Sequence, residues 1–180
     1  QVHWLSVPYT NAMSYPERIK AFFRFAVGCG RRAAAIKGDV VFATSTPLTI
    51  ALPGAYVARK QKIPMVFEVR DLWPQLPIAI GALSGTLPIF LARWLENFAY
   101  KRSKAIVALS PGMEEGVVKT GYPDEQVTVI PNSCDLDIFR VPQTAGKEFR
   151  ARYEWLQDRP LVVYCGTLGR INGVEYLAHV

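Results

Sequence analysis

The sequence of 180 residues has few of the side chains that build metal sites and nucleophilic triads. It contains three cysteines, Cys29, Cys134 and Cys165, and two histidines, His3 and His179. The cysteines lack the close spacing of a zinc site, and the sequence offers no convincing Cys–His or Ser–His–Asp arrangement. Cys29 and Cys165 are expected to be small buried residues. We therefore predict no metal and no cofactor, in a reducing, cytoplasmic environment.

Long uninterrupted hydrophobic runs are also missing. The apolar, aromatic stretch at residues 72–100 is interrupted by Pro74, Pro77, Gly81, Gly85 and Pro88. These breaks argue against a transmembrane helix. Two interpretations stay open: a buried loop and helix in the domain core, or an apolar lip at a lipid interface. Trp73 and Trp94, with basic residues nearby, suit the second interpretation.

The charge pattern is basic but carries no nucleic-acid motif. The formal net charge is +6. Half of the residues are hydrophobic, and this fraction is typical of a globular protein. The basic residues are spread along the chain, as on solvated helix faces, and no aromatic–basic ribonucleoprotein pattern accompanies them. We therefore expect no nucleic-acid partner.

Short apolar runs alternate with helical segments along the chain. Strands are predicted at residues 2–7, 39–43, 65–69, 105–109, 127–130 and 161–164. Helices are predicted at 15–37, 46–61 (with Thr46 as N-cap), 90–102, 147–156 and from 172 onward, and another opens after Ser110. Continuously apolar strands joined by helices predict an α/β fold: a Rossmann-like parallel sheet with helices on both faces.

The chain is predicted to pass from one domain into a second. Residues 133–146, which contain Asp135, Asp137, Pro142 and Gly146, interrupt the alternation, and an apolar strand pattern resumes at residue 161. We predict a first domain at 1–140, a linker with a short helix at 141–160, and the first β-α unit of a second Rossmann-like domain at 161–180. The sequence opens directly in a strand-like run and ends in a helical pattern, so we expect an internal piece of a longer protein.

Polar residues follow each predicted strand, at the carboxyl edge where sheets of this kind bind ligands. The segments that follow the strands are residues 44–47, 68–71, 110–111 and 166–170, with Asn132. Their candidates are Thr44, Ser45, Thr46, Glu68, Arg70, Asp71, Ser110, Asn132, Gly166, Thr167, Gly169 and Arg170.

Four segments resemble the family 4 retaining glycosyltransferases of GT-B architecture. Residues 67–74 read FEVRDLWP and resemble the branch that adds amino sugars or deoxy sugars to lipid-linked surface polysaccharides. Residues 129–139 (VIPNSCDLDIF), 107–113 (VALSPGM) and 164–173 (YCGTLGRING) resemble other family segments in the family's order. By comparison, the opening strands of the first domain are missing. The family's donor-contacting Glu pair is expected beyond Val180.

The resemblance implies transfer of a sugar from a nucleoside diphosphate to a hydroxyl, with retention of the anomeric configuration. It places Asp71 near the acceptor hydroxyl, as the catalytic group that orients it or accepts its proton. Acceptor-binding candidates are Arg70, Trp73, Thr44, Ser45 and Thr46. Alternatives stay open: Arg70 and Asp71 as a structural pair, and the Thr44–Thr46 hydroxyls as caps.

The glycine-rich segment is the candidate donor site. Backbone N–H groups at such a turn stabilise a departing diphosphate. The donor phosphate-binding candidates are Gly166, Thr167, Gly169, Arg170, Asn172 and Gly173. Many family members have Arg and Lys at the positions of Thr167 and Asn172, so Arg170 is the candidate charge partner. Ser110 and Asn132 either line the cleft between the domains or stabilise turns.

The expected protein is a bacterial glycosyltransferase of cell-surface polysaccharide synthesis, such as lipopolysaccharide or capsule. Its partners would be a nucleoside-diphosphate sugar and a saccharide or polyprenyl-diphosphate-linked acceptor, with peripheral contact at the inner membrane face. This chain alone is expected to be inactive. Two alternatives remain: a sugar-nucleotide epimerase of the same fold, and a non-catalytic sugar-nucleotide-binding module.

Overall fold

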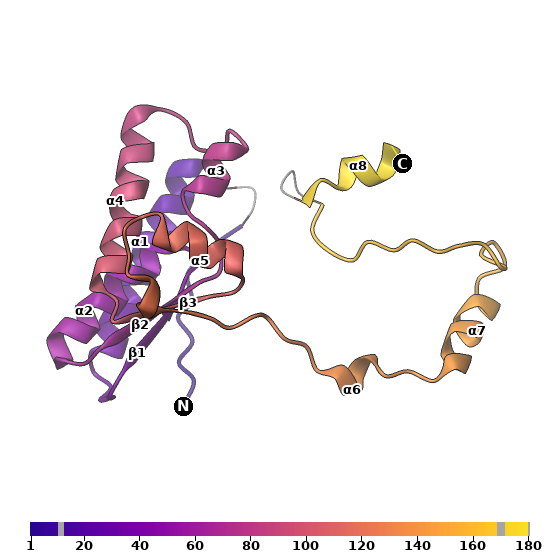
Figure 1. The fold of residues 1–180 in the computed structure, drawn as a ribbon, viewed down its shortest axis with the longest axis horizontal. Helices are drawn as coiled ribbons and strands as arrows, with labels where there is room; N and C mark the ends of the chain where they lie inside the picture. The colour runs from indigo at the N-terminus through magenta and orange to yellow at the C-terminus, as the bar shows by residue number, and fades with distance from the viewer. Residues whose placement is uncertain (11–12, 169–171, 180) are drawn as a thin grey trace. The chain divides into compact units, whose positions relative to one another are not determined.

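The computed structural model describes residues 1–10, 13–168 and 172–179 (Figure 1). The chain divides into two compact units, Gln1–Pro131 and Asn132–Val180. The first unit contains a four-stranded sheet, and the second contains short helices joined by irregular segments. The finer division into 1–140, 141–160 and 161–180 stays a prediction.

The four strands of the first unit form a parallel sheet. They are β1 (Val41–Thr44), β2 (Met65–Val69), β3 (Ala105–Ala108) and β4 (Val127–Val129), in the spatial order β1-β2-β3-β4. All three neighbouring pairs are parallel. The predicted α/β class with a Rossmann-like parallel sheet is confirmed.

Helices connect the strands of the first unit. α1 (Tyr15–Ala33) precedes β1, and η1 (Leu48–Ile50) and α2 (Ala51–Gln61) lie between β1 and β2. α3 (Gln75–Ala79) and α4 (Thr86–Arg102) connect β2 to β3, and α5 (Pro111–Val118) and η2 (Asp124–Gln126) connect β3 to β4. Because each crossover moves one strand in the same direction, right-handed connections place α2, α4 and α5 on the same face of the sheet.

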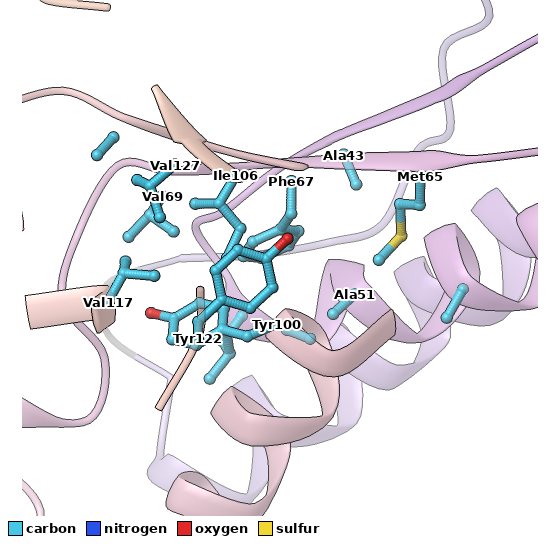
Figure 2. Close-up of a cluster of buried hydrophobic side chains, with 14 of the residues drawn as sticks. Ala43, Ala51, Met65, Phe67, Val69, Tyr100, Ile106, Val117, Tyr122 and Val127 are labelled. Carbon is cyan, nitrogen blue, oxygen red and sulfur yellow. The ribbon is translucent and has the colours of Figure 1, made fainter. Parts of the chain in front are cut away.

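The core lies between that face of the sheet and its helices (Figure 2). Phe67 of β2 meets Tyr100 of α4 edge to face, with ring centroids 6.4 Å apart, and Tyr100 meets Tyr122 in the same way at 6.4 Å. On the other face of the strands, Phe42 is exposed and Val66 is half-buried. The strands therefore alternate between a packed and a more open face. In the described part of the chain, the connecting helices cover one face of this sheet, whereas the sequence predicts helices on both faces.

Two predicted strands are wrong. Residues 2–7 and 161–164 form no strand, and Trp4 and Val162 are more than four-fifths exposed. A strand needs a neighbour for its backbone hydrogen bonds, and within the described ranges neither run has one. Cys165, expected to be buried, is therefore exposed, and Cys29 is half-buried.

The second unit contains α6 (Leu136–Phe139), α7 (Gln143–Ala151) and α8 (Val174–His179). The helix predicted from residue 172 onward forms as α8, and the helix predicted at 147–156 forms earlier, as α7. Leu156 is the single buried hydrophobic residue among those described in this unit. In the described parts of either unit, no helix is long and apolar enough to cross a membrane.

Candidate functional site

The carboxyl ends of β1 and β2 bring together most of the predicted acceptor-side residues. Thr44 ends β1 and lies opposite Glu68 of β2 in the parallel register. The loops that leave the two strands therefore start side by side at one edge of the sheet, where ligands of such sheets bind.

Ser45 connects the two loops from a buried position. Its backbone N–H donates to the carbonyl oxygen of Glu68 at 2.8 Å, and its Oγ accepts from the backbone N–H of Arg70 at 2.8 Å. The Ser45 side chain is 5% exposed, whereas its neighbours Thr44 and Thr46 are exposed. Ser45 thus holds the strand ends in place, and the threonines carry the outward-facing hydroxyls.

Thr46 connects directly to the candidate catalytic carboxylate. Its Oγ1 donates to Oδ2 of Asp71 at 2.8 Å. The backbone φ angle of Thr46 is 106°. This conformation costs a β-branched residue on the order of 1–3 kcal/mol, and residues that adopt it are concentrated at functional sites. The prediction of Thr46 as a helix N-cap is wrong, because Pro47 holds the cap position of η1 and the hydroxyl bonds Asp71.

Arg70 and Asp71 do not form the structural pair that the sequence left open. The ion pairs found in the described structure are Lys119–Glu115 and Arg140–Asp137, and the side chain of Arg70 is exposed. Asp71 is half-buried. A carboxylate offers about four lone-pair sites, so Asp71 can accept further hydrogen bonds beside the one from Thr46.

Glu68 is a predicted strand-end residue whose chemical role the sequence does not specify. It is half-buried within β2, and its Oε2 accepts a hydrogen bond from Oγ1 of Thr44. The available signal is a carboxylate inside the otherwise apolar strand MVFEV, since acidic residues are rarely buried without a partner. This edge of the sheet therefore carries two carboxylates. Glu68 accepts a hydrogen bond from Thr44, the last residue of β1, and Asp71 accepts one from Thr46, which follows β1.

Trp73 and Ser110 complete the predicted residues of the first unit. The backbone N–H of Trp73 donates to the carbonyl oxygen of Asp71 at 3.0 Å, and its half-buried ring packs against the core. Ser110 follows β3 and caps α5, because its Oγ accepts from the backbone N–H of Met113 at 3.3 Å.

The predicted donor residues lie in the second unit. The carbonyl oxygen of Thr167 accepts from the hydroxyl of Tyr164 at 3.0 Å and from Nδ2 of Asn172 at 2.5 Å. Gly173 has φ +58°, a left-handed conformation that favours glycine. Both hydrogen bonds meet at the carbonyl oxygen of Thr167, which directly follows the exposed Gly166.

The remaining predicted site residues are Asn132, Gly169 and Arg170. Gly169 and Arg170 lie outside the described residues. Asn132 is exposed and begins the second unit. Among residues 1–10, 13–168 and 172–179, no three His, Cys, Asp or Glu side chains gather to hold a metal ion.

The comparison with protein families decides the identity of the first unit. A family model described as "Glycosyl transferase 4-like domain" matches residues 1–133, well over half of the chain. The chain belongs to this family. The strand-end cluster of Thr44, Thr46, Glu68 and Asp71 thus lies within a glycosyl transferase 4-like domain.

Individual relatives of this glycosyl transferase 4-like chain are distant. It is 29% identical over 120 residues to alpha-maltose-1-phosphate synthase of Mycolicibacterium smegmatis (strain ATCC 700084 / mc(2)155), covering 64% of this chain and 30% of the relative. A crystal structure of Anabaena Alr3699/HepE in complex with UDP-glucose shares 16% identity, with a TM-score of 0.54, over 81% of this chain and 35% of that one. A structure of the same protein in complex with UDP and glucose gives a TM-score of 0.52, at 16% identity, over 78% of this chain and 34% of that one.

Because the sequence identities are low, these structural likenesses are evidence for the fold alone. The chain spans about a third of the length of these relatives. The expected GT-B family relationship is confirmed at the level of the family and of the fold of the matched region.

Proposed function

We propose that the protein is a glycosyltransferase that moves a sugar from a nucleoside-diphosphate sugar to a hydroxyl of a saccharide acceptor. The observation that carries this proposal is the Thr46–Asp71 hydrogen bond at the strand ends of a glycosyl transferase 4-like domain. The fold shared with a protein solved in complex with UDP-glucose supports a nucleoside-diphosphate sugar as donor.

Asp71 is the proposed catalytic residue. Thr46 holds one carboxylate oxygen, so the acceptor hydroxyl can donate to the remaining lone pairs and be oriented for attack on the anomeric carbon. As the new C–O bond forms, the bond to the diphosphate breaks and its electron pair leaves with the diphosphate. The hydroxyl proton passes to a base, for which Asp71 is the candidate. The resemblance to retaining enzymes supports retention.

Arg70, Trp73 and Thr44 would also bind the acceptor. Ser45 would act indirectly, because its buried Oγ accepts a hydrogen bond from the backbone N–H of Arg70. On the donor side, Gly166, Thr167, Gly169, Arg170, Asn172 and Gly173 would hold the diphosphate, with Ser110 and Asn132 lining the cleft. Backbone N–H groups and the Arg170 charge would stabilise the leaving group without a metal.

The proposed acceptor is a lipid-linked saccharide in bacterial cell-surface polysaccharide synthesis, such as a polyprenyl-diphosphate-linked sugar. The protein would act in the cytoplasm, with peripheral contact at the inner membrane face. The resemblance of residues 67–74 supports the acceptor class, and the exposed apolar residues of α4 support the membrane contact.

The experiment is a donor screen on the full-length protein. Thermal unfolding is measured with uridine, guanosine and thymidine diphosphate sugars, and a ligand at a hundredfold excess over its Kd adds about 2.7 kcal/mol of stability. Asp71→Asn should keep this stabilisation and lower transfer by about 10²–10⁴-fold, because it removes the acceptor-side base and leaves the donor loop intact. Asp124→Asn, at an exposed acidic residue of η2, is the matched control.

The products separate the alternatives. An epimerase would convert the sugar nucleotide without any acceptor, and a non-catalytic module would be stabilised with no turnover. Full transfer activity in Asp71→Asn, or no stabilisation by any donor, would count against the proposal.

A further inference from the structure

α4 carries an exposed apolar stripe that the core does not use. Leu87, Phe90, Leu91 and Trp94 are each more than half exposed. Their spacing of three, four and seven residues places them on one face of the helix. The residues of α4 that are buried are Glu96, Ala99 and Tyr100. The stripe is therefore left over after the core has been packed, and contiguous apolar surface of this kind marks interaction sites.

The stripe runs into a groove with a different chemistry. Trp94, Asn97, Phe98, Lys101 and Arg102 line a hollow of about 350 Å³ on the same helix. The rings of Trp94 and Phe98 stack with centroids 5.6 Å apart, and the guanidinium of Arg102 lies 5.6 Å from the Phe98 ring centroid. Aromatic walls beside two cations suit a phosphate group that is attached to an apolar body.

Charge around this helix has one sign. Residues 72–113 contain a single acidic residue, Glu96, which is 4% exposed. The same stretch contains the basic residues Arg93, Lys101, Arg102 and Lys104, and all of them are exposed. No exposed carboxylate in this stretch opposes the cations, so the surface is complementary to anionic headgroups.

Topology relates this surface to the candidate site. A helix that joins two parallel strands starts at their carboxyl edge and returns to their amino edge. The first turns of α4, with Leu87 and Phe90, therefore start from the edge that carries Thr46 and Asp71, and Lys101 and Arg102 lie toward the opposite edge.

We propose that this face of α4, from Leu87 to Arg102, docks the protein on a membrane surface that contains anionic lipid. The apolar stripe enters the boundary between headgroups and acyl chains, and Lys101 and Arg102 contact headgroup phosphates. Docking brings the strand-end cluster toward the lipid surface, where a lipid-linked acceptor resides. This purpose rests on the proposed function, whereas the docking itself requires no catalysis.

Flotation with vesicles tests the docking. The full-length protein is mixed at low salt with phosphatidylcholine vesicles that contain or lack phosphatidylglycerol, and the bound fraction is measured. We expect binding that depends on phosphatidylglycerol and falls with salt. The double variant Phe90→Ser/Trp94→Ser should weaken partitioning by at least about tenfold, because it removes two apolar anchors. Lys101→Glu/Arg102→Glu should weaken it similarly through headgroup repulsion.

Matched variants identify the surface. Phe23→Ser/Val27→Ser changes two residues about half exposed on α1 at the same spacing as Phe90 and Trp94. Arg59→Glu/Lys60→Glu reverses two charges in the last turn of α2, so the net charge changes as it does in the α4 charge variant. Both controls should change binding by less than about threefold.

Several outcomes would overturn the docking proposal. The first is that the unaltered protein does not float with anionic vesicles. The second is that either control variant loses as much binding as the α4 variants do. A third is self-association that Phe90→Ser/Trp94→Ser disperses without any vesicle binding, which would assign the stripe to a second copy. Thermal stabilisation by donor sugar nucleotides, measured on the same proteins, distinguishes the two proposals. If no donor stabilises the protein, the proposed function is contradicted and the docking result is unaffected.

Discussion

At the scale of single residues, Glu96 is the most unusual group of the first unit. It is 4% exposed on the packed side of α4, and its Oε1 accepts a hydrogen bond from the Tyr100 hydroxyl at 3.4 Å. Burial raises the pKa of Glu96 to about 7, against smaller opposing effects of the Tyr100 hydrogen bond and the Arg93 charge. Burial also raises the pKa of Tyr100, so this phenol stays protonated.

Replacing Glu96 with Gln should therefore change how stability depends on pH. The folded pKa lies above the unfolded value near 4.5, so the protonated form is favoured by folding. This stabilisation is fully present below pH 4.5 and is lost as the pH rises to about 7. Denaturant unfolding should show Glu96→Gln close to the unaltered protein at pH 4.5 and more stable at pH 8, by a margin on the order of 2–3 kcal/mol. A difference that stays constant across this range would contradict the assignment.

The residues of the site illustrate what sequence can and cannot predict at this scale. Thr46, Arg70 and Asp71 were predicted because polar residues after apolar strands lie at the carboxyl edge of a parallel sheet. The partner of Asp71 was not predicted, since the Thr46 contact depends on the register of β1 against β2 and on a left-handed backbone at Thr46. The role of Glu68 depends on the same register, which places it opposite Thr44.

At the scale of elements, the side chain of Ser110 caps the N-terminus of α5. Its Oγ accepts from the backbone N–H of Met113 at 3.3 Å, an N–H that also donates to the carbonyl oxygen of Ser110 at 3.0 Å, and Pro111 occupies the first turn. Only Leu109 and Ser110 separate β3 from α5, so the cap also fixes this short loop at the sheet edge.

Ser110→Ala should therefore destabilise the first unit by about 1 kcal/mol, the usual loss for an N-cap hydroxyl. Ser110→Asp should restore stability, because a carboxylate accepts the same hydrogen bond and is favoured at a helix N-terminus. Thermal or denaturant unfolding measures both variants. If Ser110→Ala instead left stability unchanged while weakening donor binding, Ser110 would be a ligand contact and not a cap.

Elements were predicted well where a local pattern suffices. β2 matches its predicted bounds of 65–69, since its apolar run follows a proline and ends in charged residues. α4 begins at Thr86, ahead of the predicted residue 90, because Pro88 is tolerated within the first turn. The strands predicted at 2–7 and 161–164 failed because a strand depends on a neighbour, which the pattern of one segment cannot reveal.

At the scale of the whole molecule, burial is concentrated in the first unit. Its core cluster draws on β1 to β4 and their helices, from Ala43 to Val127. In the second unit, Leu156 is the single buried hydrophobic among the described residues. Since stability comes mainly from buried apolar area, the unit Gln1–Pro131 should dominate the unfolding of this chain.

Two measurements check this division. Limited proteolysis should cut within residues 132–180 first, and a chain ending at Pro131 should keep its melting temperature within about 4 °C, since it loses little buried area. Phe67→Ala should lower stability by about 3–5 kcal/mol, whereas Leu156→Ala should leave the main transition in place. A large drop in melting temperature on truncation, or an equal effect of Leu156→Ala, would mean that the second unit contributes to the same cooperative fold.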